Sequence, residues 1–178
     1  DSGDYQVGSG LVMGPLDSGS VASPVMMLGA LSCSVNGNPL TRILGNGSVT
    51  SRGISLERSR NVSISDFMIR DAGTGFQATN SANLTVQGMR VFESRTNGVV
   101  VGSSSNVLFQ GMLIADGEYV GWAGYNNIQA QIRNSVIWSN QFEAIRVVGG
   151  SLNLSNSVLQ SANSPNYIFV LQGGGTIK

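Results

Sequence analysis

The chain has 178 residues, a formal net charge of zero and charged side chains at only 11% of its positions, against roughly 25% in ordinary soluble domains. It has no basic patch and no block of like charge, so the sequence carries no signature of nucleic-acid or membrane-surface binding. Its apolar runs are short and interrupted by Gly or Ser, so no transmembrane helix is expected.

The first ten residues, DSGDYQVGSG, lack the basic and apolar regions of a secretion signal. We therefore expect a mature protein, or a domain cut from a longer one. The uncharged surface must consist of Ser, Thr, Asn, Gln and Gly, a composition common in secreted β-rich proteins, and we expect an extracellular protein. The single cysteine, Cys33, excludes an intramolecular disulfide and is interpreted as a small buried apolar residue.

Residues 1–51 repeat only loosely. Residues 25–35 (VMMLGALSCSV) and 41–49 (TRILGNGSV) are predicted strands joined by the turn NGNP. We expect one or two irregular coils here. Part of residues 1–24, or a partner domain, is expected to cover the open N-terminal end.

A unit of 22–23 residues recurs over residues 52–172. Within each unit apolar residues lie two apart, as in Leu84 and Val86 and in Val99 and Val101, which predicts three short strands and no helix. A unit this short cannot bury its apolar face alone, so the units must stack. The clearest copies are SRNVSISDFMIRDA (59–72), SANLTVQGMRVFES (81–94), SSNVLFQGMLIADG (104–117), NIQAQIRNSVIWSN (127–140) and GSLNLSNSVLQSAN (150–163).

Stacked coils of three strands predict an all-β fold with three parallel sheets around one core, forming a single domain over residues 1–178. Residues one unit apart then become neighbours about 4.8 Å apart. One such column would contain Asn61, Asn83, Asn106 and Gln129, whose side-chain amides could bond from coil to coil.

The pattern resembles the right-handed parallel β-helix of the pectate-lyase-like superfamily, whose coils carry motifs of the form GIxL…S-x-N-V-x-I-x-N/G-x-x-I. The resemblance covers about residues 52–172 and implies the fold much more than an activity. Polygalacturonase-like members keep catalytic acids before the strand that here begins at Val99, in motifs resembling N-x-D and G-D-D, with G-H-G one coil later. This chain has no Asp-Asp pair, no histidine and no R-I-K motif, and Glu143 alone matches a family acid position in kind.

A pectate lyase, as the resemblance implies it, needs an acidic calcium site and a base. Glu118, Glu143 and Arg146 lie near such positions, but the two glutamates are 25 residues apart and hence offset rather than stacked.

A column of acidic residues leaves three interpretations open. Asp71, Glu93 and Asp116 each lie two residues after the last apolar residue of a strand. Arg70, Arg90 and Arg95 could neutralise them, calcium could bind them, or two carboxyls about 5 Å apart could act as in retaining glycosidases. We interpret them first as salt-bridged turn residues, with the metal site as a weaker candidate.

Aromatic residues gather after residue 115. Trp122 takes an inward position and is interpreted as core, with ligand contact as the alternative. Tyr119 and Phe142 should stack as outward neighbours, and Trp138 should also point outward. Exposed rings on a rigid β surface suit the apolar faces of sugars, while nearby acids and amides bond the hydroxyls. The alternative is that these rings pack under turns or against a neighbouring domain.

The short turns leave little room for a deep catalytic cleft. The sequence therefore predicts a non-catalytic module that binds a plant cell-wall polysaccharide such as xylan or another β-glycan, attached to a secreted glycoside-degrading enzyme and needing no cofactor. A calcium-dependent polysaccharide lyase, or a structural segment of a tailspike or adhesin, are the alternatives. The predicted ligand-binding residues are Glu118, Tyr119, Tyr125, Trp138, Phe142, Glu143 and Arg146.

Overall fold

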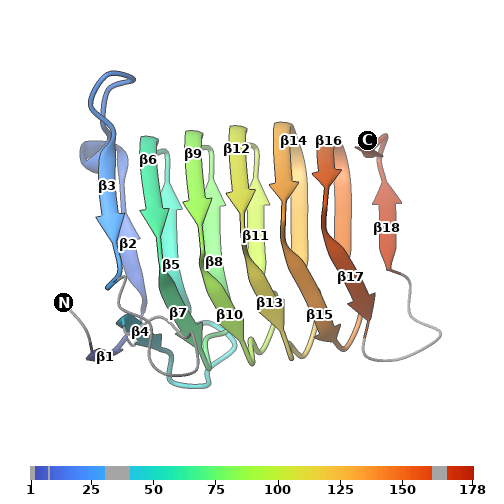
Figure 1. Ribbon diagram of the computed structural model, residues 1–178, viewed down its shortest axis with the longest axis horizontal. Coiled ribbons are helices and arrows are strands. Elements are labelled where there is room, and N and C mark those ends of the chain that lie inside the picture. The colour runs from blue at the N-terminus through green and yellow to red at the C-terminus, as the bar shows by residue number, and fades with distance from the viewer. Residues whose placement is uncertain (1–2, 8, 31–40, 162–167) are drawn as a thin grey trace.

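The computed structural model describes residues 3–7, 9–30, 41–161 and 168–178. The coils stack along the long axis of the molecule in a right-handed parallel β-solenoid (Figure 1). The predicted fold, with coils 22–23 residues apart and three strands in each, is confirmed. Cys33 and the turn NGNP lie outside the described residues. No helix among the described residues is long and apolar enough to cross a membrane.

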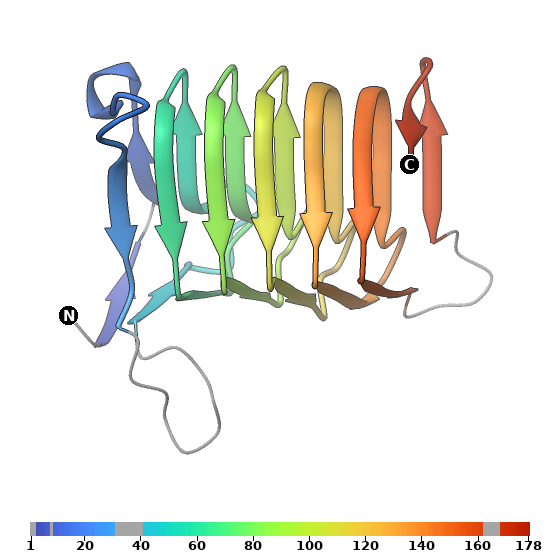
Figure 2. The same ribbon diagram turned by 45° about the horizontal axis from the view of Figure 1, so that its top comes forward.

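The strands build three parallel faces, which we call sheets 1, 2 and 3. Sheet 1 contains β1 (Gly3–Gln6), β4 (Thr41–Leu44), β7 (Phe67–Arg70), β10 (Arg90–Phe92), β13 (Leu113–Ala115), β15 (Val136–Asn140) and β17 (Val158–Ser161). Sheet 2 contains β2 (Leu11–Met13), β5 (Arg52–Glu57), β8 (Thr74–Thr79), β11 (Val99–Gly102), the first parts of β14 (Trp122–Arg133) and β16 (Ile145–Ser155), and β18 (Phe169–Gln172). Sheet 3 contains β3 (Val25–Leu28), β6 (Arg60–Ser65), β9 (Ala82–Gln87), β12 (Ser105–Gln110), the second parts of β14 and β16, and β19 (Thr176–Ile177). Figure 2 shows the three strands of each coil around the common interior.

The core consists of columns of apolar side chains in register between coils. Because a strand alternates its side chains, every second residue points inward, and the parallel register places it above its counterpart in the preceding coil. One column on sheet 1 runs through Ile43, Ile69, Val91, Ile114 and Ile137, all at most 1–2% exposed. Burial of these columns is the main stabilising contribution to the solenoid.

Irregular residues 1–51 contribute strands to the same stack. β1, β2 and β3 pair with β4, β5 and β6, so the segment before residue 29 forms a first coil. A short 3-10 turn, η1 (Pro15–Asp17), links β2 and β3. The described part of residues 1–24 supplies β1, β2 and this turn to the first coil.

The coils turn at four corners where the backbone is left-handed. One residue at each corner has φ between 47° and 66°, and the same position is left-handed in successive coils. Asn and Asp tolerate this conformation better than other residues with a Cβ atom, and Gly adopts it freely. One corner contains Asn61, Asn83, Asn106 and Gln129, and the next contains Asp66, Gly88, Gly111, Asn134 and Asn156.

The asparagine column is a hydrogen-bonded ladder, as predicted, except at its last member. Asn83 donates from Nδ2 to Oδ1 of Asn61 at 2.9 Å, and Asn61 donates to the carbonyl oxygen of Gly19 at 2.8 Å. Gln129 keeps the left-handed φ of 58° but extends no bond to this ladder within the described chain. The register between β14 and β16 then breaks between Asn127 and Ala130. The ladder therefore ends where the coil geometry changes.

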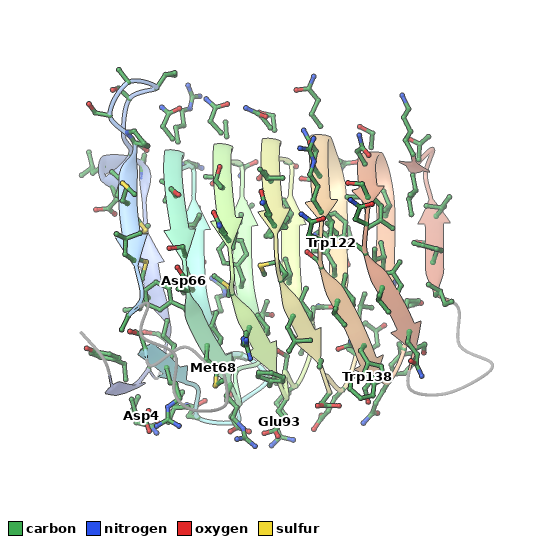
Figure 3. The ribbon with its side chains drawn as sticks, in the orientation of Figure 1. Asp4, Asp66, Met68, Glu93, Trp122 and Trp138 are labelled. Carbon is green, nitrogen blue, oxygen red and sulfur yellow. The ribbon has the colours of Figure 1, made fainter. Side chains whose placement is uncertain are left out.

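Trp122 is a core residue, as interpreted from the sequence. Trp122, which Figure 3 labels, is 1% exposed. Its ring meets Phe109 edge-on at a centroid distance of 6.3 Å. Gly124 lies two residues later on the same inward face, and a Cβ atom there would stand 2.4 Å from Cη2 of Trp122. The coils on either side carry Val101 and Val147 at this position. The missing side chain of Gly124 therefore makes room for the large ring of Trp122.

Candidate functional site

Two aromatic side chains stand one above the other in the turns that lead from sheet 1 to sheet 2. Tyr119 follows β13, and Phe142 follows β15 one coil later. The backbone N–H of Phe142 donates to the carbonyl oxygen of Tyr119 at 3.2 Å, and the ring centroids lie 4.6 Å apart at an interplanar angle of 51°. Phe142 is 44% exposed and Tyr119 is half-buried. The predicted stacking of this pair is confirmed, and the pair presents an aromatic surface to solvent.

An arginine and a carboxylate adjoin this pair. Cζ of Arg146, in β16, lies 5.3 Å from the centroid of the Tyr119 ring, which is a cation–π distance. Nη2 of Arg146 donates to both carboxylate oxygens of Glu143, at 2.8 and 2.9 Å. Only 21% of the Arg146 side chain and 11% of the Glu143 side chain are exposed. A shielded, charge-assisted pair of this kind holds both groups in fixed positions. We call Tyr119, Phe142, Glu143 and Arg146 the aromatic–arginine cluster.

The guanidinium of Arg146 stays protonated in this setting. Burial alone would lower the pKa of Arg146, but its hydrogen bonds to Glu143 and the negative charge of that carboxylate outweigh burial and raise the pKa above its ordinary value. A general base must release its proton near the working pH. Arg146 is therefore suited to be a fixed cation and hydrogen-bond donor, and it is unsuited to abstract a proton.

Arginine side chains form ion pairs with carboxylates of the predicted acidic column. Arg70 donates to Glu93 from Nε at 2.7 Å and from Nη2 at 2.6 Å, and this contact lowers the pKa of Glu93. Arg95 pairs with Glu118, and its Nη2 atom lies 3.9 Å from Oδ1 of Asp71. Figure 3 shows Glu93 among charged side chains at the lower edge of the solenoid. The sequence left three interpretations open. In the structure, Asp71 and Glu93 are turn residues that form salt bridges with arginines.

The geometry does not support a metal site in this column. Among the residues that the structure describes, no three His, Cys, Asp or Glu side chains are placed to hold a metal ion. Asp116, the third member, is exposed at the corner that Asp71 and Glu93 also occupy. The suggested grouping of Asp71, Glu93 and Asp116 as metal ligands is therefore not formed.

The structure separates the remaining predicted site residues from the cluster. Trp138 lies at the outer surface of sheet 1, where it is 51% exposed and in register with Ala115 (Figure 3). In the described part of the chain its ring stacks on no other aromatic ring. Tyr125 is half-buried farther along β14, in register with Gly102 and Val148. Of the seven predicted ligand residues, four meet in the aromatic–arginine cluster, and Glu118 lies beside it on Arg95.

Two contacts at this edge were not anticipated from the sequence. Arg95 is 23 residues before Glu118, which is one coil, so the spacing itself is a signal for their pairing. The hydroxyl of Ser161 donates to the carbonyl oxygen of Phe142 at 2.7 Å and fixes that turn from the next coil. Ser161 is 19 residues away, outside the repeat spacing, so the sequence gives no signal for this bond.

Residues 30–178 match the family model described as a right-handed β-helix region. No curated protein matches the sequence significantly.

Solved structures share the fold at low sequence identity. ORF18 of Geobacillus virus E2 is similar with a TM-score of 0.70 and 13% identity, over 92% of this chain and 34% of that protein. The Agl-KA catalytic domain has a TM-score of 0.57 and 15% identity, over 99% of this chain and 40% of that domain. The periplasmic alginate epimerase AlgG has a TM-score of 0.48 and 14% identity, over 78% of this chain and 46% of that protein. The chain thus spans less than half the length of each, and the first two likenesses show the fold alone.

Proposed function

We propose that this chain, which belongs to the right-handed β-helix family, is a non-catalytic module that binds a neutral polysaccharide through the aromatic–arginine cluster. The observation that carries the proposal is the contact between the tilted rings of Tyr119 and Phe142 on a surface turn, with Phe142 44% exposed and a fixed cation beside Tyr119.

Ring surfaces of this kind suit carbohydrate. The C–H faces of a pyranose are apolar and pack on a flat aromatic ring, while hydroxyl groups around the ring need polar partners. The apolar packing surface comes from the rings of Tyr119 and Phe142. Polar partners for the hydroxyl groups come from Arg146, Glu143 and the neighbouring Glu118. The stacked turns are held by backbone hydrogen bonds, so little conformational entropy is lost when a sugar binds.

The charge of the cluster favours a neutral ligand. Glu143 and Arg146 form one ion pair, and Glu118 is paired with Arg95, so the cluster carries no excess charge for a polyanion. The same pairing supports binding over catalysis. Each carboxylate is engaged in an ion pair with an arginine, and the raised pKa of Arg146 makes it a poor proton acceptor. We expect a xylan-like or other β-glycan of the plant cell wall as ligand, and an extracellular setting beside a catalytic domain.

The proposal is tested by affinity electrophoresis in gels that contain xylan, β-glucan, mannan or pectin, each with calcium and with a chelator. Retardation by a neutral glycan in both conditions, with no reducing ends or unsaturated products released, is the expected result. Retardation only by pectin with calcium, together with unsaturated product, would instead establish a lyase.

A second candidate, a structural segment of a larger assembly, is favoured by one observation. The outer surface of sheet 1 carries a column in which Leu113, Val136 and Val158 follow one another, and Val158 is 62% exposed. Apolar side chains on an outer face suit contact with another protein surface. Stable self-association without retardation by any glycan would favour this candidate.

A further inference from the structure

A polar groove lies on the outer surface of sheet 3, on a different face from the aromatic–arginine cluster. Its volume is about 320 Å³, near the lower end of the range of roughly 300–1,000 Å³ typical of small-ligand sites. Strands β14 and β16 form it, together with Lys178, which follows β19. The lining residues are Gln129, Ala130, Gln131, Ser151, Leu152, Asn153 and Lys178.

The register break between β14 and β16 positions the groove. Asn127 pairs with Gly150 and Ala130 with Leu152, so the two residues between Asn127 and Ala130 face a single residue, Ser151. Such bulges redirect side chains, and they are frequent beside functional sites. On this outer face, long side chains from β14 stand beside the shorter Ser151 and Asn153 of β16. The difference in side-chain length leaves a hollow along β16.

Gln129 sits in this bulge with a φ of 58°, a conformation that is uncommon for a residue other than Gly, Asn or Asp. The equivalent residues Asn61, Asn83 and Asn106 share this conformation, so it belongs to the repeating corner of the solenoid. Here the bulge directs an exposed amide to the rim of the groove.

The groove offers hydrogen-bonding groups that the chain leaves available. Within the described residues, the side chains of Gln129, Ser151 and Asn153 bond to no other protein group. Oε1 of Gln131 accepts a hydrogen bond from Nη2 of Arg133 at 2.5 Å, which orients the amide and leaves its Nε2 atom as a donor. Lys178 adds an ammonium group, and its backbone is fixed by bonds to Leu152 and Leu154. No aspartate or glutamate lines the groove.

In the outward column of sheet 3 that lines the groove, only β14 and β16 carry amide side chains. In the column that contains Gln131 and Asn153, the earlier coils carry Met26, Ser63, Thr85 and Leu108. The ladder of asparagine amides, which uses its own donors and acceptors, also stops before Gln129. The groove is therefore a local concentration of unused amide and hydroxyl groups, distinct from the repeating scaffold.

We propose that this groove is a second saccharide-binding subsite, which holds one or two sugar units through hydrogen bonds to their hydroxyl groups. Amides and hydroxyls that both donate and accept match sugar hydroxyls, which do the same. The inference rests on the proposed function for its ligand class, but it uses a separate set of residues. Two sites on one rigid body would strengthen retention on a polysaccharide, because the second contact forms at a high effective concentration.

The test is an NMR titration of ¹⁵N-labelled protein with xylohexaose, cellohexaose and mannohexaose, performed on the wild type and on Tyr119→Ala. We expect the backbone amide signals of Ser151 and Asn153 to shift and saturate with at least one hexasaccharide in both proteins. Signals of Tyr119 and Phe142 report the aromatic–arginine cluster separately, so the two sites fail or succeed independently. If the groove signals stay unshifted with all three ligands while the cluster signals move, the subsite is excluded and the proposed function stands.

Two variants sharpen the result. Asn153→Ala removes one amide and should weaken the groove titration by about fivefold, as expected for the loss of roughly one hydrogen bond. Thr85→Ala, which lies in the same column three coils earlier, is the matched control and should leave the titration unchanged. Groove shifts that are identical in Asn153→Ala and the wild type would overturn the assignment.

Discussion

Asn106 donates its side-chain amide to Oδ1 of Asn83 at 2.9 Å, one coil earlier, and both residues are left-handed with φ of 51° and 54°. The same side chain therefore meets two requirements of the corner. It tolerates a backbone conformation that most residues avoid, and it joins neighbouring coils through a hydrogen bond. Repetition of this contact explains why the corner keeps its register over several coils.

Gln129→Asn should extend the ladder by one step and stabilise the protein. Asparagine accommodates the left-handed φ of this position more easily, and its shorter amide reaches the Oδ1 atom of Asn106. We expect the free energy of unfolding to rise by about 0.5–1.5 kcal/mol, the usual net value of one hydrogen bond. Urea denaturation measures the change. Gln131→Asn, in a regular strand position, is the control and should show no gain; an equal gain in both variants would contradict the ladder account.

Trp122 and Gly124 should behave as one coupled unit. Gly124→Val alone introduces a side chain where the indole lies, and Trp122→Val alone leaves a cavity; large-to-small changes of this kind cost about 3–5 kcal/mol. The double variant restores the pattern of the adjacent coil, where Val99 and Val101 occupy these positions. We expect it to be more stable than the sum of the single effects by about 1–3 kcal/mol. A double-mutant cycle by thermal or chemical denaturation tests this, and additive effects would show that the two sites are independent.

The pair of Arg70 and Glu93 predicts an acid-sensitive contribution to stability. The hydrogen bond from Arg70 lowers the pKa of Glu93 below its ordinary value of 4.5 in the folded state. A carboxylate with a lowered folded pKa stabilises the fold above its unfolded pKa, and this stabilisation is lost as the pH falls through the folded pKa.

Arg70→Gln should therefore flatten the fall in the free energy of unfolding between about pH 5 and about pH 3. Because both side chains are substantially exposed, the effect should stay within roughly 0.2–1 kcal/mol and shrink in high salt. Urea denaturation across this pH range provides the measurement, with Arg52→Gln as a control. The same slope in wild type and Arg70→Gln would refute the assignment.

The repeat spacing made much of this structure predictable. A spacing of 22–23 residues fixes the parallel register, so the inward position of Trp122, the amide ladder and the stacking of Tyr119 on Phe142 all follow from it. Side-chain partners were harder to predict, since several arginines lie within reach of each acid. In the structure, Arg95 pairs with Glu118 and Arg70 pairs with Glu93.

The polar groove was not predicted because it depends on a change of one residue in spacing. Asn127 and Gly150 are 23 residues apart, whereas Ala130 and Leu152 are 22 apart. Spacings of 22 and 23 both occur elsewhere in the chain without a comparable hollow, for instance from Val62 to Leu84 and from Leu84 to Val107. The sequence therefore contains the shortened unit but does not indicate where the extra residue is accommodated.

Trp138→Ala should weaken polysaccharide retention less than Phe142→Ala. Both rings are exposed, but Trp138 lies on sheet 1 without an aromatic partner in the described chain, whereas Phe142 stacks on Tyr119. Phe142→Ala removes one ring of the pair and also the contact that positions the Tyr119 ring, a contact worth about 0.5–1.5 kcal/mol. Affinity electrophoresis at several glycan concentrations gives both dissociation constants. An equal or larger loss for Trp138→Ala would move the binding surface onto the outer face of sheet 1.

The most direct test of the proposed function compares the retardation of the wild type, Tyr119→Ala and Tyr5→Ala in gels that contain the neutral glycan that the wild type binds. Tyr5 is an exposed tyrosine at the other end of the solenoid, and its variant controls for the loss of an aromatic ring. The account predicts that Tyr119→Ala loses most of its retardation while keeping the circular dichroism spectrum and melting temperature of a folded protein, and that Tyr5→Ala migrates as the wild type does. Undiminished retardation of a folded Tyr119→Ala would contradict the assignment of polysaccharide binding to the aromatic–arginine cluster.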